Sequence, residues 1–320
     1  MAQIRGPAYL WTMQDLRIIF MGTPEFAVPS LQILVENGFD VVAVITAPDK
    51  PKGRGRKLAT SPVKDYALSQ DIPILQPTNL KDPAFIEELR SYKANLQVVV
   101  AFRMLPVVVW DMPEIGTFNL HASLLPQYRG AAPINWAIMN GETVTGATTF
   151  FLKHEIDTGN VIFQQEEPIH ASDDAGSLYG RLMEMGAGLV LKTVQAIQAG
   201  DYPQDPQDES REIKHAPKIF KETCEIDWQR PAEDLYNFIR GLSPYPAAWT
   251  TFEGKQMKVF KTEVLDSSNL APGDFASDGS SYLHAGTGSH DLRILELQLE
   301  GKKRMPADAF LRGYTFNTES

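Results

Sequence analysis

The chain has 320 residues, of which 43% are hydrophobic, and its formal net charge is −10 at pH 7. A chain of this length can bury a full core and suggests two domains, whereas its acidic balance argues against a protein that coats nucleic acid without specificity. Cys224 is the one cysteine and excludes an internal disulfide framework, and the six histidines show no ligand spacing, so we expect no structural metal.

The N-terminal residues and the hydropathy of the chain predict where the protein works. Residues 1–15 contain no long apolar segment of the kind found in signal peptides, and no apolar run of about twenty residues occurs in the chain. We therefore expect a cytoplasmic protein that does not contact a membrane. Residues 1–15 also lack a helix or strand pattern, and we expect a disordered extension, with Met13 as an alternative start.

The first half of the chain alternates strand patterns with helix patterns. Apolar runs predict strands at residues 16–22, 40–47, 95–102 and 116–122, and amphipathic patterns predict helices at residues 25–38, 63–70, 84–92 and 133–141. This alternation is typical of an open α/β sheet. The turn after the first strand has Gly22 as its only glycine, so the GxGxxG fingerprint is absent and we expect no nicotinamide or flavin cofactor.

The basic segment DKPKGRGRK, residues 49–57, follows the second predicted strand. Its five cations surround two glycines and a proline, and only Asp49 opposes them. Such a charge run is either a solvated loop or a site for phosphate groups, and both interpretations remain open at this point.

The segment NLHASLLPQYRGAAP, residues 119–133, begins at the end of a predicted strand. Side chains alternate along a strand, so Asn119 and His121 point to the same face. Ligands of open α/β sheets bind outside the carboxyl ends of the strands, which is where this segment lies. The pair therefore fits an active site, although a hydrogen-bonded polar pair at a strand end is the alternative.

The rest of the same segment is conformationally restricted. Pro126 and Pro133 fix the backbone, while Gly130 permits a turn that other residues resist. A preorganised wall of a ligand pocket would need these properties. The alternative is an ordinary strand-to-helix connection in which Arg129 forms a salt bridge.

The second half of the chain begins with two β-rich runs at residues 145–152 and 160–169, and the turn between them presents Asp157 beside Gly159. A long helix is predicted at residues 174–200, and the proline-rich, acidic residues 201–212 are typical of a linker. Beyond it we expect one helix at residues 231–242 and a small β-barrel with strands such as 247–252, 256–265 and 292–299.

Together these motifs are specific for a known family. GTPEFAVPSL, PDKPKGRGRK, SPVK, NLHASLLPQYRGAAPI, EIDTG, EIDW and GKKRMPADAFLRG resemble methionyl-tRNA formyltransferases of bacteria and organelles, from about Leu16 to the C-terminus. The resemblance implies an α/β, Rossmann-like formyltransferase domain with a parallel-rich sheet at residues 16–200, a linker at 201–212 and an OB-like β-barrel domain that binds tRNA at 213–320. It also implies a bacterial cytoplasmic protein, which we expect to be a monomer.

The resemblance also implies an activity and the residues that carry it. The enzyme would transfer the formyl group of 10-formyltetrahydrofolate, a co-substrate, to the amino group of initiator methionyl-tRNA, with no tightly bound cofactor and no metal. The implied catalytic residues are Asn119, His121 and Asp157. The implied folate-binding residues are Ser123, Leu124, Leu125 and Pro126. The implied tRNA-binding residues are Lys52, Arg54, Arg56, Lys57, Lys302, Lys303 and Arg304.

One position departs from the family pattern. Where relatives commonly have glycine after an aromatic residue, this chain reads AFRML, which places Arg103 near the expected pterin pocket.

The implied site suits the chemistry. Formyl transfer to an amine needs a neutral nucleophile, an oxyanion stabiliser and a proton path. Asn119 can donate to the oxyanion, His121 can donate to it or relay a proton, and Asp157 can orient the imidazole. Two alternatives stay open: a formyltransferase that acts on a small amine, which would need no basic loop, and a folate-binding or RNA-binding protein without turnover. The basic loop and the segment GKKRM favour tRNA.

Overall fold

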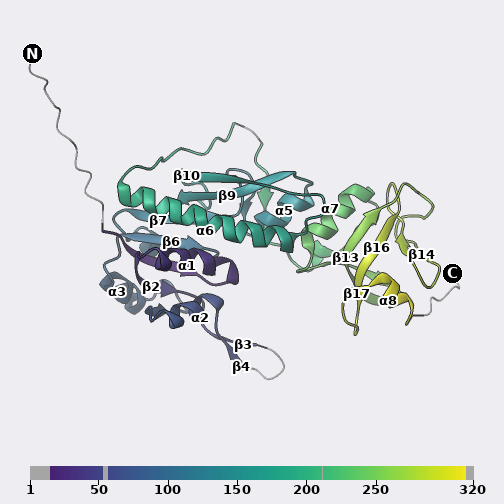
Figure 1. Ribbon diagram of the computed structural model, residues 1–320, viewed down its shortest axis with the longest axis horizontal. Helices are drawn as coiled ribbons and strands as arrows, with labels where there is room; N and C mark the ends of the chain where they lie inside the picture. The colour runs from purple at the N-terminus through teal and green to yellow at the C-terminus, as the bar shows by residue number, and fades with distance from the viewer. Residues whose placement is uncertain (1–14, 53–56, 211, 315–320) are drawn as a thin grey trace, which may run out of the picture. The chain divides into compact units, whose positions relative to one another are not determined.

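The computed structural model describes residues 15–52, 57–210 and 212–314 (Figure 1). The chain forms two compact units. One unit comprises the residues up to Pro126, Ala147–Gln165 and Leu182–Arg211, and the other comprises Gln127–Gly146, Glu166–Arg181 and Glu212–Ser320. Within the described ranges, every helix is too short or too polar to span a bilayer.

A seven-stranded sheet in the order β10-β9-β7-β6-β1-β2-β5 organises the first part of the chain (Figure 1). Neighbouring strands from β5 to β7 run parallel, and β9 is antiparallel to β7. The parallel-rich α/β sheet that the sequence predicts is thereby confirmed. The strands are β1 (Arg17–Gly22), β2 (Asp40–Ile45), β5 (Ile74–Leu75), β6 (Leu96–Val100), β7 (Gly116–His121), β9 (Val144–Phe151) and β10 (Val161–Pro168).

Helices lie between these strands, and two of them begin at residues that suit a helix start. The side chain of Ser61 accepts a hydrogen bond from the Lys64 N–H, and that of Asp82 accepts one from the Ala84 N–H, so each satisfies a backbone donor of the first turn. Proline follows each cap and fits the first helical position. The helices between strands of this sheet are α1 (Val28–Glu36), preceded by the 3-10 turn Glu25–Ala27, α2 (Pro62–Ser69), α3 (Pro83–Ser91), α4 (Val107–Trp110) and α5 (Pro133–Met139). Helix α6 (Ala175–Ala199) follows β10.

The basic segment after β2 is a hairpin rather than an unpaired loop. Strands β3 (Lys50–Lys52) and β4 (Lys57–Ala59) pair antiparallel. A polar cluster lies at the base of the hairpin: Lys64 Nζ donates to Asp49 Oδ2 at 2.6 Å and to Gln76 Oε1 at 2.8 Å, and Gln76 Nε2 donates to Asp49 Oδ1 at 2.8 Å. The base is therefore tied to α2 and to the residue after β5.

The second unit contains a curled antiparallel sheet in the order β12-β13-β16-β15-β14, with β17 paired to β16, which confirms the expected barrel-like domain. Helix α7 (Ala232–Leu242) packs its apolar face, including Leu235 and Ile239, into the same buried cluster as Val259 and Leu297 of the sheet. The strands are β12 (Ala248–Phe252), β13 (Lys255–Val264), β14 (Phe275–Ser277), β15 (Leu283–Ala285), β16 (Leu292–Leu299) and β17 (Met305–Pro306), followed by α8 (Ala307–Leu311).

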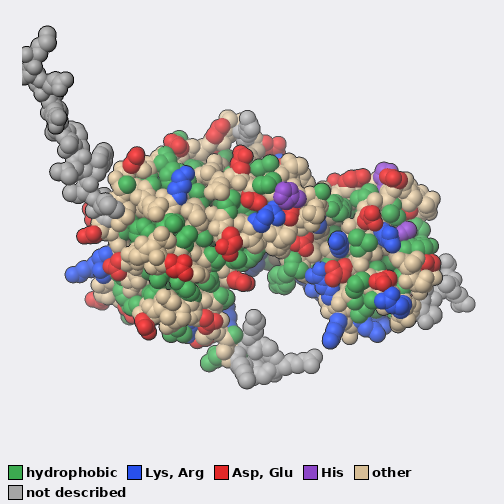
Figure 2. Space-filling view, in the orientation of Figure 1, with side chains coloured by type: hydrophobic (Ala, Val, Ile, Leu, Met, Phe, Trp, Pro, Cys, Tyr) green, Lys and Arg blue, Asp and Glu red, His purple; other side chains and the backbone are tan. Residues whose placement is uncertain are grey.

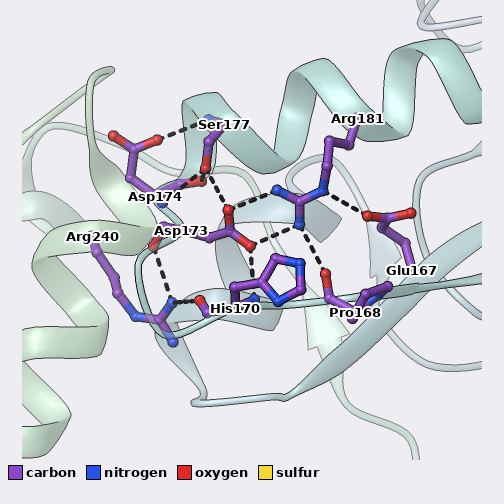
Figure 3. A network of polar contacts seen from close by, with 8 residues as sticks. All are labelled: Glu167, Pro168, His170, Asp173, Asp174, Ser177, Arg181 and Arg240. Atoms are coloured by element: carbon purple, nitrogen blue, oxygen red, sulfur yellow. Dashed lines mark hydrogen bonds and ion pairs between the residues drawn. The ribbon is translucent and has the colours of Figure 1, made fainter.

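A largely buried ion-pair network holds the start of α6 within the second unit (Figure 3). Arg181 makes two hydrogen bonds of 2.7 Å to Asp173 and one of 2.6 Å to Glu167. Asp173 also accepts from the Ser177 hydroxyl at 2.9 Å, and Arg240 donates to its backbone carbonyl at 3.0 Å. The hydrogen bonds from Arg181, more than any other contact, hold the pKa of the Asp173 carboxyl well below the usual range, although the side chain is only 6% exposed and its burial acts in the opposite direction.

Candidate active site

The carboxyl ends of three parallel strands meet at one edge of the seven-stranded sheet. Gly22 at the end of β1 is opposite Val100 at the end of β6, and Val100 is opposite Leu120 of β7. A Cβ atom on Gly22 would lie 2.6 Å from Ala27 Cβ and 3.1 Å from the Val100 carbonyl oxygen, so glycine is needed for the close approach of the chain here. This edge is where open α/β sheets bind ligands.

Asn119 and His121 lie on one face of β7 at this edge. Leu120, between them, contacts helix α6, because a Cβ atom on Gly186 would lie only 2.8 Å from its side chain. The alternation of a strand therefore directs Asn119 and His121 to the opposite face. His121 is 6% exposed and Asn119 is half-buried.

Asp157 comes to His121 from the loop between β9 and β10. Its Oδ2 lies 4.0 Å from His121 Nδ1, within ion-pair range but longer than a hydrogen bond, and both side chains are largely buried. The backbone of Asp157 has a φ of +58°, which is uncommon for a residue with a side chain. Two residues further on, a Cβ atom on Gly159 would collide with the Phe151 carbonyl oxygen at 1.5 Å. The structure thus brings the three predicted catalytic residues to one face.

The four predicted folate-binding residues follow His121 and fall into two groups. Ser123 and Leu125 are buried, and their backbone groups are already bonded: Thr148 Oγ1 donates to the Ser123 carbonyl at 2.6 Å and accepts from the Leu125 N–H at 3.1 Å. Leu124 and Pro126 are half-buried. The first pair is therefore placed to hold the segment, and the second pair remains accessible to a ligand.

Gln164 of β10 supports the same segment. Its Nε2 donates to the Leu125 carbonyl at 2.8 Å and to Thr148 Oγ1 at 3.0 Å. Because β10 and β9 both contribute to this support, the conformation of residues 123–125 depends on strands far along the chain.

The second half of the predicted wall belongs to the other unit. Strand β8 (Arg129–Gly130) pairs parallel with β11 (His215–Ala216), and a Cβ atom on Gly130 would lie 2.3 Å from the Ala216 carbonyl oxygen. Gly130 also has a φ of +131°. Glycine is therefore required both for the backbone angle, as predicted, and for strand pairing, which the sequence did not indicate.

Tyr128 fixes the segment around β8 within the second unit. It is buried, and its hydroxyl donates to Glu142 Oε1 at 2.6 Å, while Lys214 Nζ donates to that oxygen at 2.5 Å. Burial, followed by the hydrogen bond to Glu142, raises the pKa of the Tyr128 phenol. The hydroxyl is therefore protonated and donates at neutral pH.

Arg103, the departure from the family pattern, is engaged with the backbone. Its guanidinium donates to the Pro77 carbonyl at 2.5 Å and to the Thr78 carbonyl at 3.1 Å, and it lies 5.8 Å from the centre of the Phe102 ring. Two residues before it, Ala101 has a φ of +49°. The side chain therefore fastens the loop after β6 to the loop after β5.

The predicted tRNA-binding residues are only partly described. Arg54 and Arg56 lie outside the described residues, and Lys52 and Lys57 are described only as backbone within the hairpin. Arg304 stacks over Phe260 at 4.2 Å and makes two 2.7 Å hydrogen bonds to Glu296. On the face in Figure 2, Lys and Arg side chains over the second unit are mixed with acidic ones.

Lys302 and Lys303 are exposed, so their charges face solvent, whereas that of Arg304 is neutralised by Glu296. Over the ranges that the structure describes, no group of three or more His, Cys, Asp or Glu side chains could hold a metal ion.

Sequence patterns did not indicate three residues that support the site. Thr148 and Gln164 hold the segment after β7, and Gln207, from the predicted linker, donates through its side chain to the backbone of the Asp157 loop. Each is a single polar residue in a strand or linker, and such a residue forms no sequence pattern that would indicate a supporting role. Only the register of β9 against β7 and the path of residues 201–210 reveal them.

Comparisons with known proteins agree with this geometry. The family model described as "Formyl transferase" matches residues 16–194, and that described as "Formyl transferase, C-terminal domain" matches residues 218–315. A methionyl-tRNA formyltransferase of Bacteroides fragilis is 56% identical over 94% of this chain and 96% of its own, and one of Flavobacterium johnsoniae is 50% identical over 96% and 99%. The crystal structure of WlaRD, a sugar 3N-formyl transferase, is similar with a TM-score of 0.66 at 21% identity, over 91% of this chain and all of that one.

The fold and the two family matches define an enzyme of the formyl transferase class. Within that class the relatives are similar over nearly the whole length of both chains. The chain belongs to the methionyl-tRNA formyltransferase family.

Proposed function

We propose that this enzyme transfers the formyl group of 10-formyltetrahydrofolate to the free amino group of initiator methionyl-tRNA, giving N-formylmethionyl-tRNA for translation initiation. The observation that carries the proposal is the site at the carboxyl edge of the sheet, where Asn119, His121 and Asp157 share one face. The methionyl-tRNA formyltransferase relatives match the chain over nearly its whole length. The residue roles below are part of the same proposal.

The reaction begins when the neutral α-amine attacks the formyl carbon of the folate. A carbon–nitrogen bond forms, and the carbonyl oxygen becomes the oxyanion of a tetrahedral intermediate. Asn119 donates its amide N–H to that oxygen, and His121, on the same strand face, is placed to donate as well. Such donors stabilise charge that develops only in the transition state, so they act on the rate of transfer.

The proton of the attacking amine must leave, and N10 of the folate must gain one. Asp157 accepts from the amine and orients the imidazole, and His121 relays a proton toward the departing nitrogen. The bond between the formyl carbon and N10 then breaks, which leaves tetrahydrofolate. The reaction needs no covalent enzyme intermediate. The 4.0 Å separation of the two side chains fits a free enzyme, in which catalytic hydrogen bonds are often long.

The folate would lie against the segment after β7. Leu124 and Pro126 offer accessible apolar surface there, while Ser123 and Leu125 keep the segment in place. The co-substrate dissociates after each turnover, so the enzyme carries no tightly bound cofactor.

The tRNA would be held by basic residues outside the chemical site. We assign this role to the hairpin cations Lys52, Arg54, Arg56 and Lys57 and to Lys302, Lys303 and Arg304 of the second unit. For Arg304 the role requires exchange of its Glu296 partner for a phosphate. We further propose a catalytic domain at residues 16–200, a linker at 201–212 and a tRNA-binding domain at 213–320. The working state would be a monomer in the bacterial cytoplasm.

One substrate comparison tests the proposal. The purified enzyme is given 10-formyltetrahydrofolate with methionyl initiator tRNA, methionyl elongator tRNA or an amino sugar, and formylated product is measured by mass spectrometry. We expect product mainly from the initiator tRNA. Preferential formylation of the amino sugar would support the small-amine alternative, and no product from any acceptor would support a binding protein without turnover.

A further inference from the structure

The Asp157 loop needs support from outside itself. Asp157 has a left-handed φ of +58°, a conformation that is uncommon for a residue with a side chain and that persists only where its surroundings impose it. Two side-chain hydrogen bonds lie within the loop: Thr158 Oγ1 donates to the Glu155 carbonyl at 3.1 Å, and Lys153 Nζ donates to Asn160 Oδ1 at 2.7 Å. Neither of these bonds involves the backbone of Asp157.

Gln207 supplies a bond to that backbone. Its side-chain Nε2 donates to the carbonyl oxygen of Asp157 at 2.7 Å and to that of Gly159 at 2.9 Å, so both N–H groups of one amide are used on the two residues that bracket Thr158. The orientation of the amide is settled by its partners, because an oxygen at that position would face two other acceptors. Gln207 is half-buried.

The chain just before Gln207 is itself fixed to the first unit. Asp205 and Val161 exchange two backbone hydrogen bonds, of 3.0 and 2.7 Å, and the Tyr202 ring packs against the Phe151 ring with their centres 5.8 Å apart. Gln207 therefore projects from an anchored strand-like segment and not from a free linker, which makes its reach to the loop reproducible.

We propose that Gln207 is a positioning residue for formyl transfer: by holding the carbonyls on both sides of Thr158, it fixes the backbone angle of Asp157 and thereby the place of its carboxylate opposite His121. This inference rests on the proposed role of Asp157. It assigns to the segment between the domains a part in catalysis.

The test uses the full-length enzyme with Gln207→Leu, which keeps the bulk but removes both donors, and Gln207→Glu, whose carboxylate would repel the two carbonyls. We expect kcat to fall about tenfold to a hundredfold, because a shift of about 1 Å in a catalytic group can cost about a hundredfold. The KM values for folate and tRNA should stay within about twofold. Gln204→Leu is the matched control, since Gln204 is exposed in the same segment, and it should behave as wild type.

A double-mutant cycle separates positioning from a general structural effect. If Gln207 acts through Asp157, the Gln207→Leu change should have almost no further effect on single-turnover rates in an Asp157→Asn background. Full additivity of the two changes would overturn the inference, and so would wild-type kcat in both Gln207 variants. Circular dichroism and the unchanged KM values show that the variants are folded. If Gln207→Leu does not fold, the same measurements on Gln207→Glu test the inference.

The failure of the proposed function has a different signature. If Asp157→Asn alone retains wild-type transfer, the role of Asp157 is wrong whatever the Gln207 variants do. If Asp157→Asn is impaired and the Gln207 variants are normal, the role of Asp157 stands and only the positioning inference is overturned.

Discussion

His121 and Asp157 are separated by 4.0 Å across a largely buried gap, whereas Asn119 is placed by the strand that also carries His121. The site therefore has a strand half, Asn119 and His121, and a loop half, Asp157, which are held in place by different contacts. The Asn119–His121 pair is rigid because β7 is bonded on both sides, to β6 and to β9. The carboxylate depends on a loop, so its geometry is the more sensitive to substitution.

The first prediction concerns the rigid half. Asn119→Ala and His121→Ala should each lower kcat about a hundredfold to a thousandfold, because each removes a donor to the developing oxyanion. Binding of folate, measured by titration calorimetry, should be nearly unchanged, since the accessible wall residues Leu124 and Pro126 are retained. Near-normal turnover by either variant would remove that residue from the mechanism.

The second prediction concerns the carboxylate. Asp157→Asn should lose most of its activity, because an amide accepts a proton from the amine far less readily and can hold the imidazole in the wrong tautomer. The measurement is the dependence of kcat/KM on pH. If the rise and fall of kcat/KM occur at the same pH values in wild type and variant, and the rates are similar, Asp157 is only a turn residue.

At the scale of elements, the start of α6 is fixed by charge. Asp174 and Ser177 form a capping box, in which each side chain accepts from the other's backbone. The Ser177 N–H donates to Asp174 Oδ1 at 2.8 Å, and the Asp174 N–H donates to Ser177 Oγ at 3.1 Å. Arg181, one turn further on, binds Asp173 (Figure 3). The long helix thus begins where the charges of Asp173 and Arg181 compensate each other.

The third prediction is that this network stabilises the fold in a pH-dependent way. Asp173→Asn should lower the free energy of unfolding by about 1.5–3 kcal/mol at pH 7, since it weakens the charge-assisted hydrogen bonds to Arg181, which keeps Glu167 as a partner. The folded-state pKa of Asp173 is depressed, so its contribution is fully present above the unfolded value of about 3.9 and is lost as pH falls through the folded value.

Urea unfolding at several pH values measures this effect, with the exposed Glu184→Gln on the same helix as control. The difference between wild type and Asp173→Asn should shrink below about pH 4. A difference that is the same at pH 7 and pH 3 would contradict the assignment to Asp173 ionisation.

The fourth prediction concerns the hairpin base. Lys64→Met removes the donor that Asp49 and Gln76 share, and should raise KM for tRNA about twofold to fivefold, in keeping with the small energy of a partly exposed ion pair. KM for folate should not change. Lys81→Met, at an exposed lysine elsewhere, is the control. An equal rise in both KM values would mean that Lys64 supports the whole sheet edge instead.

At the scale of the whole molecule, substitutions in the basic segment should change tRNA affinity without changing folate affinity. Replacing Arg54, Arg56 and Lys57 with alanine should weaken tRNA binding, raise KM for tRNA, and flatten the salt dependence by about 0.7 in the log–log slope for each single-stranded phosphate that the enzyme no longer neutralises. Folate affinity should stay the same, because the chemical site lies on β7 and the Asp157 loop. Unchanged kinetics and salt slope would reopen the small-amine alternative.

Much of this organisation could be predicted from sequence, because it depends on local periodicity. The period of two along β7 placed Asn119 and His121 on one face, and the turn residues around Asp157 marked a loop. What could not be predicted depends on contacts between distant segments. The pairing of Gly130 with Ala216, the hairpin within a glycine-rich basic run, and the contact of Gln207 with Asp157 leave no periodic trace in the chain.

The anchoring of residues 201–210 has an evolutionary consequence. Connections between domains usually tolerate insertions and deletions, since their length has little effect on folding. Here the backbone of Asp205 is bonded to that of Val161, and Gln207 follows two residues later. One residue inserted or deleted between Asp205 and Gln207 would move Gln207 out of register with the loop. Among relatives, substitutions should therefore be common at Pro203 and Gln204, whereas insertions and deletions before Gln207 should be rare.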